Sequence, residues 1–339
     1  LARHKVLFAL LGLGGLLFAA VGGWAAYLNH QISAIPRIDL DLGSDVLVGA
    51  GLGTGTGHVE RPPRPTGKAA KSVNILVAGV DAGESSRILD GLEDGAWVPG
   101  SHRSDVIMVL HLSADRRKAY VISVPRDTWV PIDGYGMAKI NAAFSYGGPP
   151  LYVHTLEQFT GLRMDHLAII DWAGFKDLTD ALGGVEIEGA TGPTRLDGEQ
   201  ALDYVRERYS LPRGDLDRIQ RQQNVLRAIT VQLMSAGTLS NPVKLTDVLK
   251  AVTHSIVVDR NLTNERMREL ALSLRGLRGG DLTQITVPVA GLDRVDGQSI
   301  VRVDPDKARE LFGAAITDEL DKYVATRDVD TLPAPASVR

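Results

Sequence analysis

The stretch DVIMVLHLSADRRKAYVISVPRD, residues 105–127, decides the fold class. It holds two short apolar runs, 105–112 and 118–124, joined by the polar turn 113–117. Apolar runs of this length, bounded by turn residues, predict two neighbouring strands in a hairpin. Because hairpins join antiparallel strands, we expect at least one antiparallel pair in the sheet.

Outward from this hairpin, short apolar runs alternate with segments of helical periodicity. The other predicted strands are residues 74–80, 166–170, 185–188 and 284–289. The predicted helices are residues 150–159, 174–181, 198–204, 217–234, 245–256, 264–274 and 305–320. This alternation predicts a single α/β domain over residues 73–324, and the hairpin makes its β-sheet a mixed one.

The composition is that of a globular protein and excludes several classes of function. The 339 residues are 44% hydrophobic and 23% charged, which rules out wholesale disorder. The absence of cysteine excludes disulfides, cysteine-bound iron–sulfur clusters and thiol nucleophiles. A formal net charge of −4 argues against a general nucleic-acid binder, since phosphate-backbone affinity needs a basic surface.

Residues 6–28 predict a transmembrane helix. They carry no charged side chain, and a helix of this length spans about 34 Å, enough for a bilayer core. Arg3, His4 and Lys5 precede the segment, so the positive-inside rule predicts a cytoplasmic N-terminus, residues 1–5. Everything after residue 28 is then extracytoplasmic at the cell membrane. A cleaved signal peptide is the alternative interpretation.

Two segments predict flexible chain. Residues 29–72 are rich in glycine and proline and are interpreted as an extracytoplasmic stalk. Their glycine-rich run 46–57 fits no dinucleotide-binding spacing and leads into Arg-Pro-Pro-Arg-Pro rather than a helix. Residues 325–339 are interpreted as a flexible tail.

Polar side chains cluster at the ends of the predicted strands. Asp81 follows the strand 74–80, Arg126 and Asp127 follow 118–124, and Asp171 follows 166–170. Asp105 instead begins its strand. Ligands of open α/β sheets bind beyond the carboxyl ends of strands, so this edge is the predicted site.

Residues 201–229 hold a second polar cluster. The predicted helix there places Arg218, Arg221, Gln222 and Val225 on one face by their spacing. Guanidinium groups bind phosphate oxygens bidentately, and carboxylates suit Mg²⁺. The two clusters together therefore indicate metal-assisted phosphoryl chemistry, with a solvated basic helix face as the alternative. P-loop, H-E-x-x-H and G-x-S-x-G motifs are absent from the sequence.

Four motifs in order resemble the LytR-CpsA-Psr family. They are R-S-D-V at 103–106, V-P-R-D at 124–127, K-I-N-A-A-F at 139–144 and R-x-R…G-D-x-x-R-x-x-R-Q-Q at 206–223. The resemblance implies a mixed β-sheet flanked by helices in an α/β/α arrangement, with a long apolar groove for a lipid. It also implies a bacterial, membrane-anchored enzyme. Such an enzyme transfers a glycopolymer, such as a teichoic acid or an arabinogalactan, from a polyprenyl-pyrophosphate carrier onto peptidoglycan. Nucleic acid is not an expected partner.

The same resemblance implies roles for individual residues. Asp81 and Asp105 correspond to ligands of Mg²⁺, for which Mn²⁺ can substitute, and Arg126 to the arginine that grips the pyrophosphate. The rest of the implied pyrophosphate-binding shell is Arg103, Arg206, Arg208, Arg218 and Gln222, ordered by Asp215. Asp105 and Asp127 both stay open as the general base. Two further hypotheses are a polyprenyl-pyrophosphate hydrolase and a non-catalytic protein that binds or regulates envelope polymer.

Overall fold

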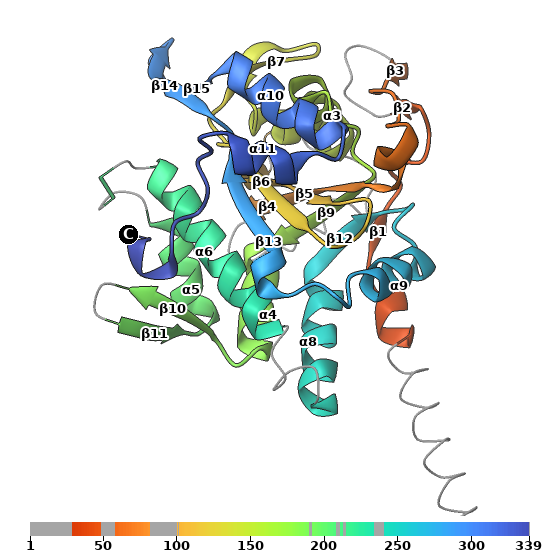
Figure 1. The fold of residues 1–339 in the computed structure, drawn as a ribbon, viewed down its shortest axis with the longest axis vertical. Helices are drawn as coiled ribbons and strands as arrows, with labels where there is room; N and C mark the ends of the chain where they lie inside the picture. The colour runs from red at the N-terminus through yellow and green to blue at the C-terminus, as the bar shows by residue number, and fades with distance from the viewer. Residues whose placement is uncertain are drawn as a thin grey trace, which may run out of the picture.

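The computed structural model describes residues 29–48, 58–81, 100, 102–189, 192–207, 211–212, 215–233 and 241–338. Its centre is a seven-stranded sheet of order β1-β12-β9-β4-β5-β6-β13 (Figure 1). The strands in this order are Arg37–Ile38, Ile256–Asp259, His166–Asp171, Val73–Asp81, Arg103–Leu112, Ala119–Ser123 and Leu282–Thr286.

The sheet is mixed, as predicted. Strand β4 pairs in parallel with β9 and antiparallel with β5, which pairs antiparallel with β6. The predicted hairpin across 113–117 is confirmed by the β5–β6 pair. Because β5 runs against its neighbours, its first residues lie at the same sheet edge as the last residues of β4, β6 and β9.

Helices cover both faces of the sheet, which confirms the predicted arrangement. On one face α3 (Ala142–Thr160), α10 (Pro305–Ile316) and α11 (Leu320–Thr326) pack on the apolar side chains of the central strands. The other helices are α4 (Trp172–Ala181), α5 (Gly198–Arg206), α6 (Asp215–Leu233), α8 (Pro242–Ser255) and α9 (Asn264–Ser273). The predicted helix 305–320 is divided in two, because Asp318 has a left-handed φ of 58°.

A smaller apolar core lies beside the main one. The hairpin of β10 (Val185–Gly189) and β11 (Gly192–Leu196) packs there with α4, α5, α6 and α8. The predicted strand 185–188 therefore exists, but it lies in this hairpin and not in the central sheet.

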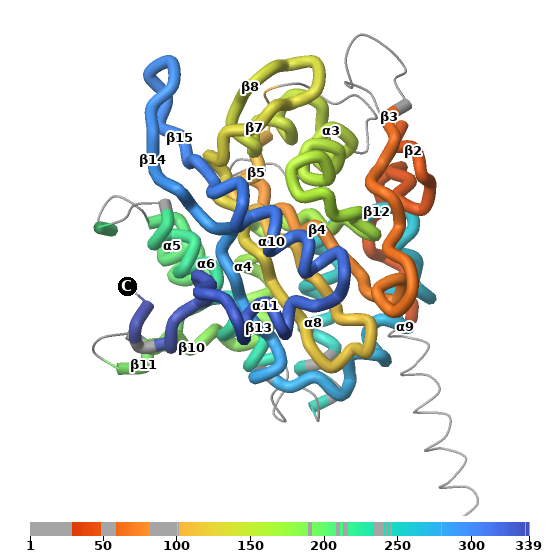
Figure 2. Tube along the Cα trace, turned by 45° about the horizontal axis from the view of Figure 1, so that its top comes forward, coloured from red at the N-terminus to blue at the C-terminus, as the bar shows by residue number. Residues whose placement is uncertain are grey.

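Two further hairpins, which the sequence patterns did not predict, project from one end of the domain (Figure 2). One is β7 (Trp129–Ile132) with β8 (Gly136–Lys139), and the other is β14 (Val289–Val295) with β15 (Gln298–Val303). A bridge between Thr128 and Val301 joins them. Their strands are short, and only a few of their residues, such as Val130, Ile132 and Ile300, are buried, so their apolar patterns are too brief to predict strands.

The prediction of a flexible stalk at 29–72 is wrong for the residues that the structure describes. Strands β1, β2 (Val46–Val48) and β3 (His58–Glu60) and the short helix η1 (Gly67–Lys71) lie within it. Leu40, Leu42 and Leu47 are at most 2% exposed and belong to the main core. The glycine and proline content suggested a linker, but the leucines between them bury enough apolar surface to hold the segment on the domain.

The prediction of a flexible tail at 325–339 is also wrong for its described residues, which end at 338. Thr331 forms a bridge with Ile285, and Arg227 Nη1 donates to the carbonyl oxygen of Pro333 at 2.8 Å. Val338 is 6% exposed. Contacts with distant strands and helices, which local composition does not report, hold this segment.

Within the part of the chain that the structure describes, no helix is both long enough and apolar enough to cross a membrane. The predicted span, residues 6–28, lies outside the described residues.

Candidate functional site

A β-bulge brings Asp105 to the sheet edge where the strand ends meet. Gly79 pairs with Val106 and Val80 with Ser104, so Asp105 is the extra residue that has no partner position on β4. Bulges re-aim a side chain relative to a regular strand. Gly79 is needed here, because a Cβ on it would lie 2.7 Å from the Cβ of Val106.

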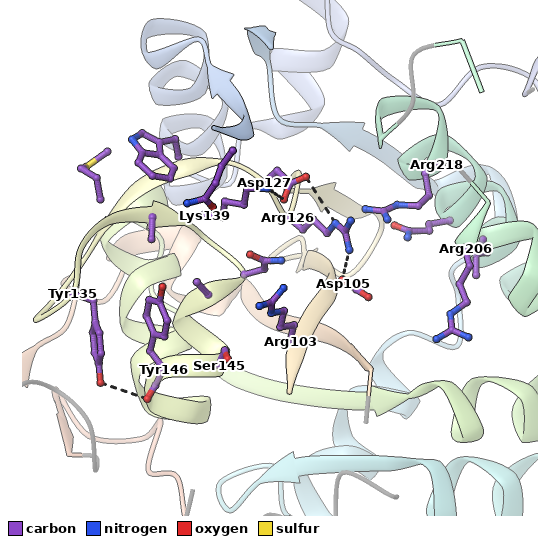
Figure 3. Close-up of a pocket in the computed structure, with 18 of the residues that line it drawn as sticks. Arg103, Asp105, Arg126, Asp127, Tyr135, Lys139, Ser145, Tyr146, Arg206 and Arg218 are labelled. Atoms are coloured by element: carbon purple, nitrogen blue, oxygen red, sulfur yellow. Dashed lines mark hydrogen bonds and ion pairs between the residues drawn. The ribbon is translucent and has the colours of Figure 1, made fainter. Parts of the chain in front are cut away.

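Arg126 lies at the centre of the site (Figure 3). It follows β6, and its Nη1 donates to Oδ1 of Asp105. Its own carbonyl oxygen accepts from the backbone N–H of Asn141 at 3.2 Å, which holds the β7–β8 hairpin against it. Asp127 Oδ2 lies 4.0 Å from the Nε of Arg126, and Asp127 Oδ1 lies 3.0 Å from the Nζ of Lys139.

A second arginine–carboxylate pair joins the sheet to the helical side of the site. Arg206, the last residue of α5, lies 2.9 Å from Asp81 at the end of β4. The guanidinium of Arg206 also lies 5.4 Å from the ring centroid of Trp172, a cation–π distance. Asp81 and Asp105, the two predicted metal ligands, are therefore both within reach of arginines at one edge of the sheet.

Helix α6 presents Arg218 and Gln222 to the site. Both line the same cavity as Arg126 and are less than 10% exposed. Gln223 fixes the helix against the sheet, since its Nε2 donates to the hydroxyl of Ser123 at 2.9 Å. Arg221, three residues after Arg218 on this helix, does not line the cavity, and its guanidinium stacks on the ring of Tyr204 at 4.6 Å.

Other predicted polar residues are not gathered in the cavity by the described structure. Asp171 caps α4, where its carboxylate accepts from the N–H of Gly174 at 2.7 Å. Arg208 lies outside the described residues, and Asp215 is placed as the first residue of α6 without a described side chain. The roles implied for Arg208 and Asp215 therefore stay predictions.

The cavity at this edge has a volume of about 710 Å³. Of the predicted polar groups, Arg103, Asp105, Arg126, Asp127, Arg206, Arg218 and Gln222 line it, whereas Asp81 is held beside it through its pair with Arg206. The lining also includes residues that we did not assign: Trp129, Tyr135, Met137, Lys139, Asn141, Ser145, Tyr146, Trp172 and Gln298. Lys139 and Asn141 belong to the K-I-N-A-A-F motif, which could have identified them as site residues. Tyr135 and Tyr146 are adjacent to glycines in the sequence, which is a weaker indication of a site.

The comparison with protein families identifies the family of the chain that forms this cavity. The family model described as the LytR_cpsA_psr family matches residues 56–316. The chain belongs to the LytR-CpsA-Psr family. The matched region contains every described element that lines the cavity, so the family is recognised over the site itself as well as over the fold.

Two relatives of this chain are named as cell-wall proteins. The cell wall biosynthesis protein LcpA of Corynebacterium glutamicum is 30% identical, covering 93% of this chain and 66% of LcpA. The polyisoprenyl-teichoic acid–peptidoglycan teichoic acid transferase TagU of Enterococcus faecalis is 30% identical, covering 70% of this chain and 79% of TagU. The chain thus spans just under two thirds of the length of LcpA.

Solved structures of the LytR-CpsA-Psr family share this fold. The LytR-Csp2A-Psr enzyme from Actinomyces oris matches with a TM-score of 0.60 and 22% identity, covering 83% of this chain and 95% of that chain. This confirms the mixed sheet flanked by helices as the architecture common to both proteins.

The carboxylates of the site suit a divalent cation that is shared with a phosphate ligand. The described residues contain no group of three or more His, Asp and Glu side chains placed to hold a metal ion by themselves. Mg²⁺ commonly takes only one or two protein carboxylates and completes its shell with substrate phosphates and water. Asp81 and Asp105 fit that partial donor set.

Proposed function

We propose that this chain transfers a glycopolymer from a polyprenyl-pyrophosphate carrier onto peptidoglycan at the outer face of the cell membrane. The observation that carries the proposal is the cavity at the sheet edge, where Arg103, Arg126, Arg206 and Arg218 gather around two carboxylates. Several guanidinium forks in one cavity suit a pyrophosphate better than a single carboxylate ligand. TagU, named as a transferase of teichoic acid to peptidoglycan, supports the same type of acceptor and polymer.

The reaction requires one bond to form and one to break. A hydroxyl oxygen of the peptidoglycan attacks the phosphorus that carries the glycopolymer, and the bond from this phosphorus to the bridging oxygen breaks. The products are a glycopolymer joined to peptidoglycan by a phosphodiester, and polyprenyl phosphate. The arginines stabilise the charge that develops on the leaving phosphate, which is the main source of rate in phosphoryl transfer.

Arg126 is preorganised for this role. Its ion pair with Asp105 and the hydrogen bond from Asn141 to its carbonyl oxygen set its position before substrate arrives. Arg218 is 5% exposed, so it meets the pyrophosphate in a poorly hydrated place where electrostatic attraction is strong.

A Mg²⁺ ion held by Asp81 and Asp105 would neutralise pyrophosphate charge when bound. Asp127 is then the better general base of the two candidates, since Asp105 is committed to Arg126 and to the metal. Asp127 faces the cavity beside Lys139, and its carboxylate accepts the proton of the attacking hydroxyl.

The lipid part of the donor fits the helical side of the cavity. Trp172 and Val205 line the cavity and also belong to the smaller apolar core formed with α4, α5 and α6. An apolar chain leaving the arginines on this side meets apolar side chains immediately. The uncharged segment 6–28 supports a membrane anchor that keeps the domain close to a lipid-linked donor.

Product analysis with the purified full-length chain tests the proposal. The chain is incubated with a polyprenyl-pyrophosphate-linked glycopolymer, with and without peptidoglycan, in the presence and absence of Mg²⁺. Polymer attached to peptidoglycan, dependent on Mg²⁺, supports transfer. Free polymer formed equally with and without peptidoglycan indicates the hydrolase, and metal-independent binding without turnover indicates the non-catalytic protein.

The Arg126→Ala variant should lower kcat by about 10²–10³-fold, as removal of one preorganised donor does. Arg126→Lys should recover only part of the rate, because a point charge replaces a bidentate fork. Arg260→Ala is the matched control, since Arg260 is an exposed arginine paired with Asp39 and Asp41 away from the cavity. Wild-type transfer rates in Arg126→Ala would refute the assignment of this site.

A further inference from the structure

The cavity has an aromatic end that the pyrophosphate chemistry does not use. The rings of Tyr135 and Tyr146 stack with centroids 4.7 Å apart and an interplanar angle of 20°, and both line the cavity. Figure 3 shows this pair at one end of the site and Arg206 and Arg218 at the other, with Lys139 between them. The phosphate-binding groups and the tyrosines therefore occupy opposite ends of one cavity.

The backbone is shaped to present both rings. Tyr135 is at the tip of the β7–β8 turn between Gly134 and Gly136, which have positive φ values of 77° and 75°. Tyr146 ends the first turn of α3, immediately before a kink at Gly147 and Gly148. Gly148 has φ 66° and ψ −160°, a conformation that is essentially restricted to glycine. Two unusual backbone segments thus bring one tyrosine each to the same place.

The aromatic end is open to solvent although its side chains are large and apolar. Tyr135 is 44% exposed and Met137, on the next strand, is 51% exposed. Trp129, on β7, also lines the cavity. Exposed apolar groups concentrated at the mouth of a cavity mark a binding surface.

Polar groups flank this apolar surface. Ser145 lines the cavity next to Tyr146, and Asn141 and Lys139 line it toward Arg126. A pyranose ring has the complementary character, with apolar C–H faces and hydroxyl groups around its edge. Aromatic rings that offer a flat apolar face, next to a few placed polar groups, fit such a ring.

We propose that the Tyr135–Tyr146 pair is a stacking platform for a sugar ring of the acceptor glycan. The inference rests on the proposed function and specifies where that function's acceptor binds. The first sugar of the donor is bonded directly to the pyrophosphate and so lies near the arginines, whereas the platform is at the far, open end. A ring on the platform would direct a hydroxyl toward Asp127, the proposed base.

The position of the platform in the whole domain favours a wall glycan over a lipid surface. In Figure 1 strand β7 is at the top of the domain, whereas residues 29–33, where the described chain begins, are at the lower right, below α9. If residues 6–28 anchor the chain, the platform faces away from the membrane. Long glycan strands can approach the open end from that side.

The test measures acceptor and donor kinetics separately with the full-length chain, using peptide-free glycan strands as the acceptor. Tyr135→Ala and Tyr146→Ala should each raise the acceptor KM roughly three- to tenfold, the loss expected for one aromatic stacking contact. The donor KM should change less. Tyr135→Phe, which keeps the ring, should stay within about twofold of wild type in acceptor KM. Leu292→Ala is the control, since Leu292 is 62% exposed on the neighbouring hairpin and does not line the cavity.

Two results would overturn the inference. Equal acceptor KM values in wild type and both alanine variants would show that the platform binds no acceptor. A donor KM raised as much as the acceptor KM would assign the platform to the donor's own sugars. Binding of the glycan strands in the absence of donor separates this inference from the proposed function. If the wild-type chain shows no transfer activity but binds glycan strands, and the alanine variants bind them more weakly, the proposed transfer is refuted and the platform is supported.

Discussion

A single residue outside the regular strand pattern gives the site its central carboxylate. In a regular β5, Asp105 would pair with a position on β4, and the next residues would alternate between faces. The bulge removes that partner position and turns Asp105 to Arg126. The close approach of the two strands at this point depends on the missing side chain of Gly79.

The Gly79→Ala variant should therefore damage the site by distorting the bulge. The added Cβ would lie 2.7 Å from the Cβ of Val106 and 2.9 Å from its Cγ2, so β4 and β5 must separate. We expect a loss of about 1–3 kcal/mol in the free energy of unfolding, typical of overpacking, and a lower kcat because Asp105 shifts. Urea unfolding and the transfer assay measure the two effects.

Gly291→Ala is the matched control for this variant. Gly291 is also a strand residue, in β14, and a Cβ added there meets no atom within 4 Å. Its unfolding free energy and its kcat should stay close to wild type. Equal effects of the two substitutions would contradict the account of the bulge.

At the scale of elements, α3 connects the core to the mouth of the cavity. The part after the kink packs Leu151, Tyr152 and Leu156 in the main core, all at 0% exposure. In the first turn Ala143 and Phe144 are also buried in this core, whereas Ala142 and Ser145 line the cavity. The kink depends on Gly147, because a Cβ there would lie 2.7 Å from the Cβ of Leu151.

His154 on α3 should make stability depend on pH. Burial lowers the pKa of the His154 imidazole below its usual 6.5, although Asp133 on the β7–β8 turn and Glu157 act in the opposite direction. The folded state thus favours the neutral ring. Below about pH 6.5 the unfolded chain binds the proton more readily, so the stabilising contribution is complete above that pH and is lost as pH falls toward the folded pKa.

Urea unfolding at pH 7.5 and pH 5.5 measures this contribution. The decrease in unfolding free energy between the two pH values should be smaller in His154→Gln than in wild type. His254→Gln, at an exposed position on α8, should keep the wild-type decrease. An unchanged pH dependence in His154→Gln would show that His154 does not contribute.

At the scale of the whole molecule, the segment before the central sheet is a structural part of the domain. Arg61 and Glu157 form an ion pair with Nη2 and Oε1 2.5 Å apart, and both side chains are 0% exposed. Arg61 also donates to the carbonyl oxygens of Leu42 and Met164. One side chain therefore joins the N-terminal segment to α3 and to the chain leading into β9.

Arg61→Ala should be strongly destabilising because it leaves the carboxylate of Glu157 buried without its cation. We expect a loss of about 3–5 kcal/mol in the free energy of unfolding, measured by urea unfolding. The double variant Arg61→Met/Glu157→Leu should recover most of this loss, since it removes both charges.

Arg64→Ala is the control at the same scale. Arg64 is three residues away, and its pair with Asp45 is exposed, at 49% and 79% for the two side chains. Exposed pairs contribute about 0–1 kcal/mol, so this variant should be nearly as stable as wild type. Similar losses for Arg61→Ala and Arg64→Ala would contradict the buried role of Arg61.

Prediction from the sequence succeeded where local pattern and function coincide. The central strands were found because a strand covered on both faces must be apolar along its length, and β4 and β6 are. The polar residues at their ends, Asp81, Arg126 and Asp127, were found because the carboxyl ends of parallel strands meet at one edge. The four family motifs extended this to the arginines of α5 and α6.

Prediction failed where contacts between distant segments decide the structure. Residues 37–48 and 58–72 resemble a linker in composition, yet Leu40 and Leu42 are buried by strands and helices far away in sequence. Arg221 follows Arg218 at helical spacing, but its guanidinium stacks on the ring of Tyr204 of α5 and does not line the cavity. Local composition and periodicity do not contain such contacts.

The sequence by itself therefore determined the class of fold, the family and the chemical character of the site. These depend on hydrophobic runs, strand ends and motif spacing, which are local properties of the chain. Only the tertiary structure decided that Asp105 faces Arg126 across a bulge, that two tyrosines from separate elements stack at the cavity mouth, and that the N-terminal segment belongs to the domain. Each of these features depends on contacts between residues that are distant in sequence, and only the packing of the whole chain brings those residues together.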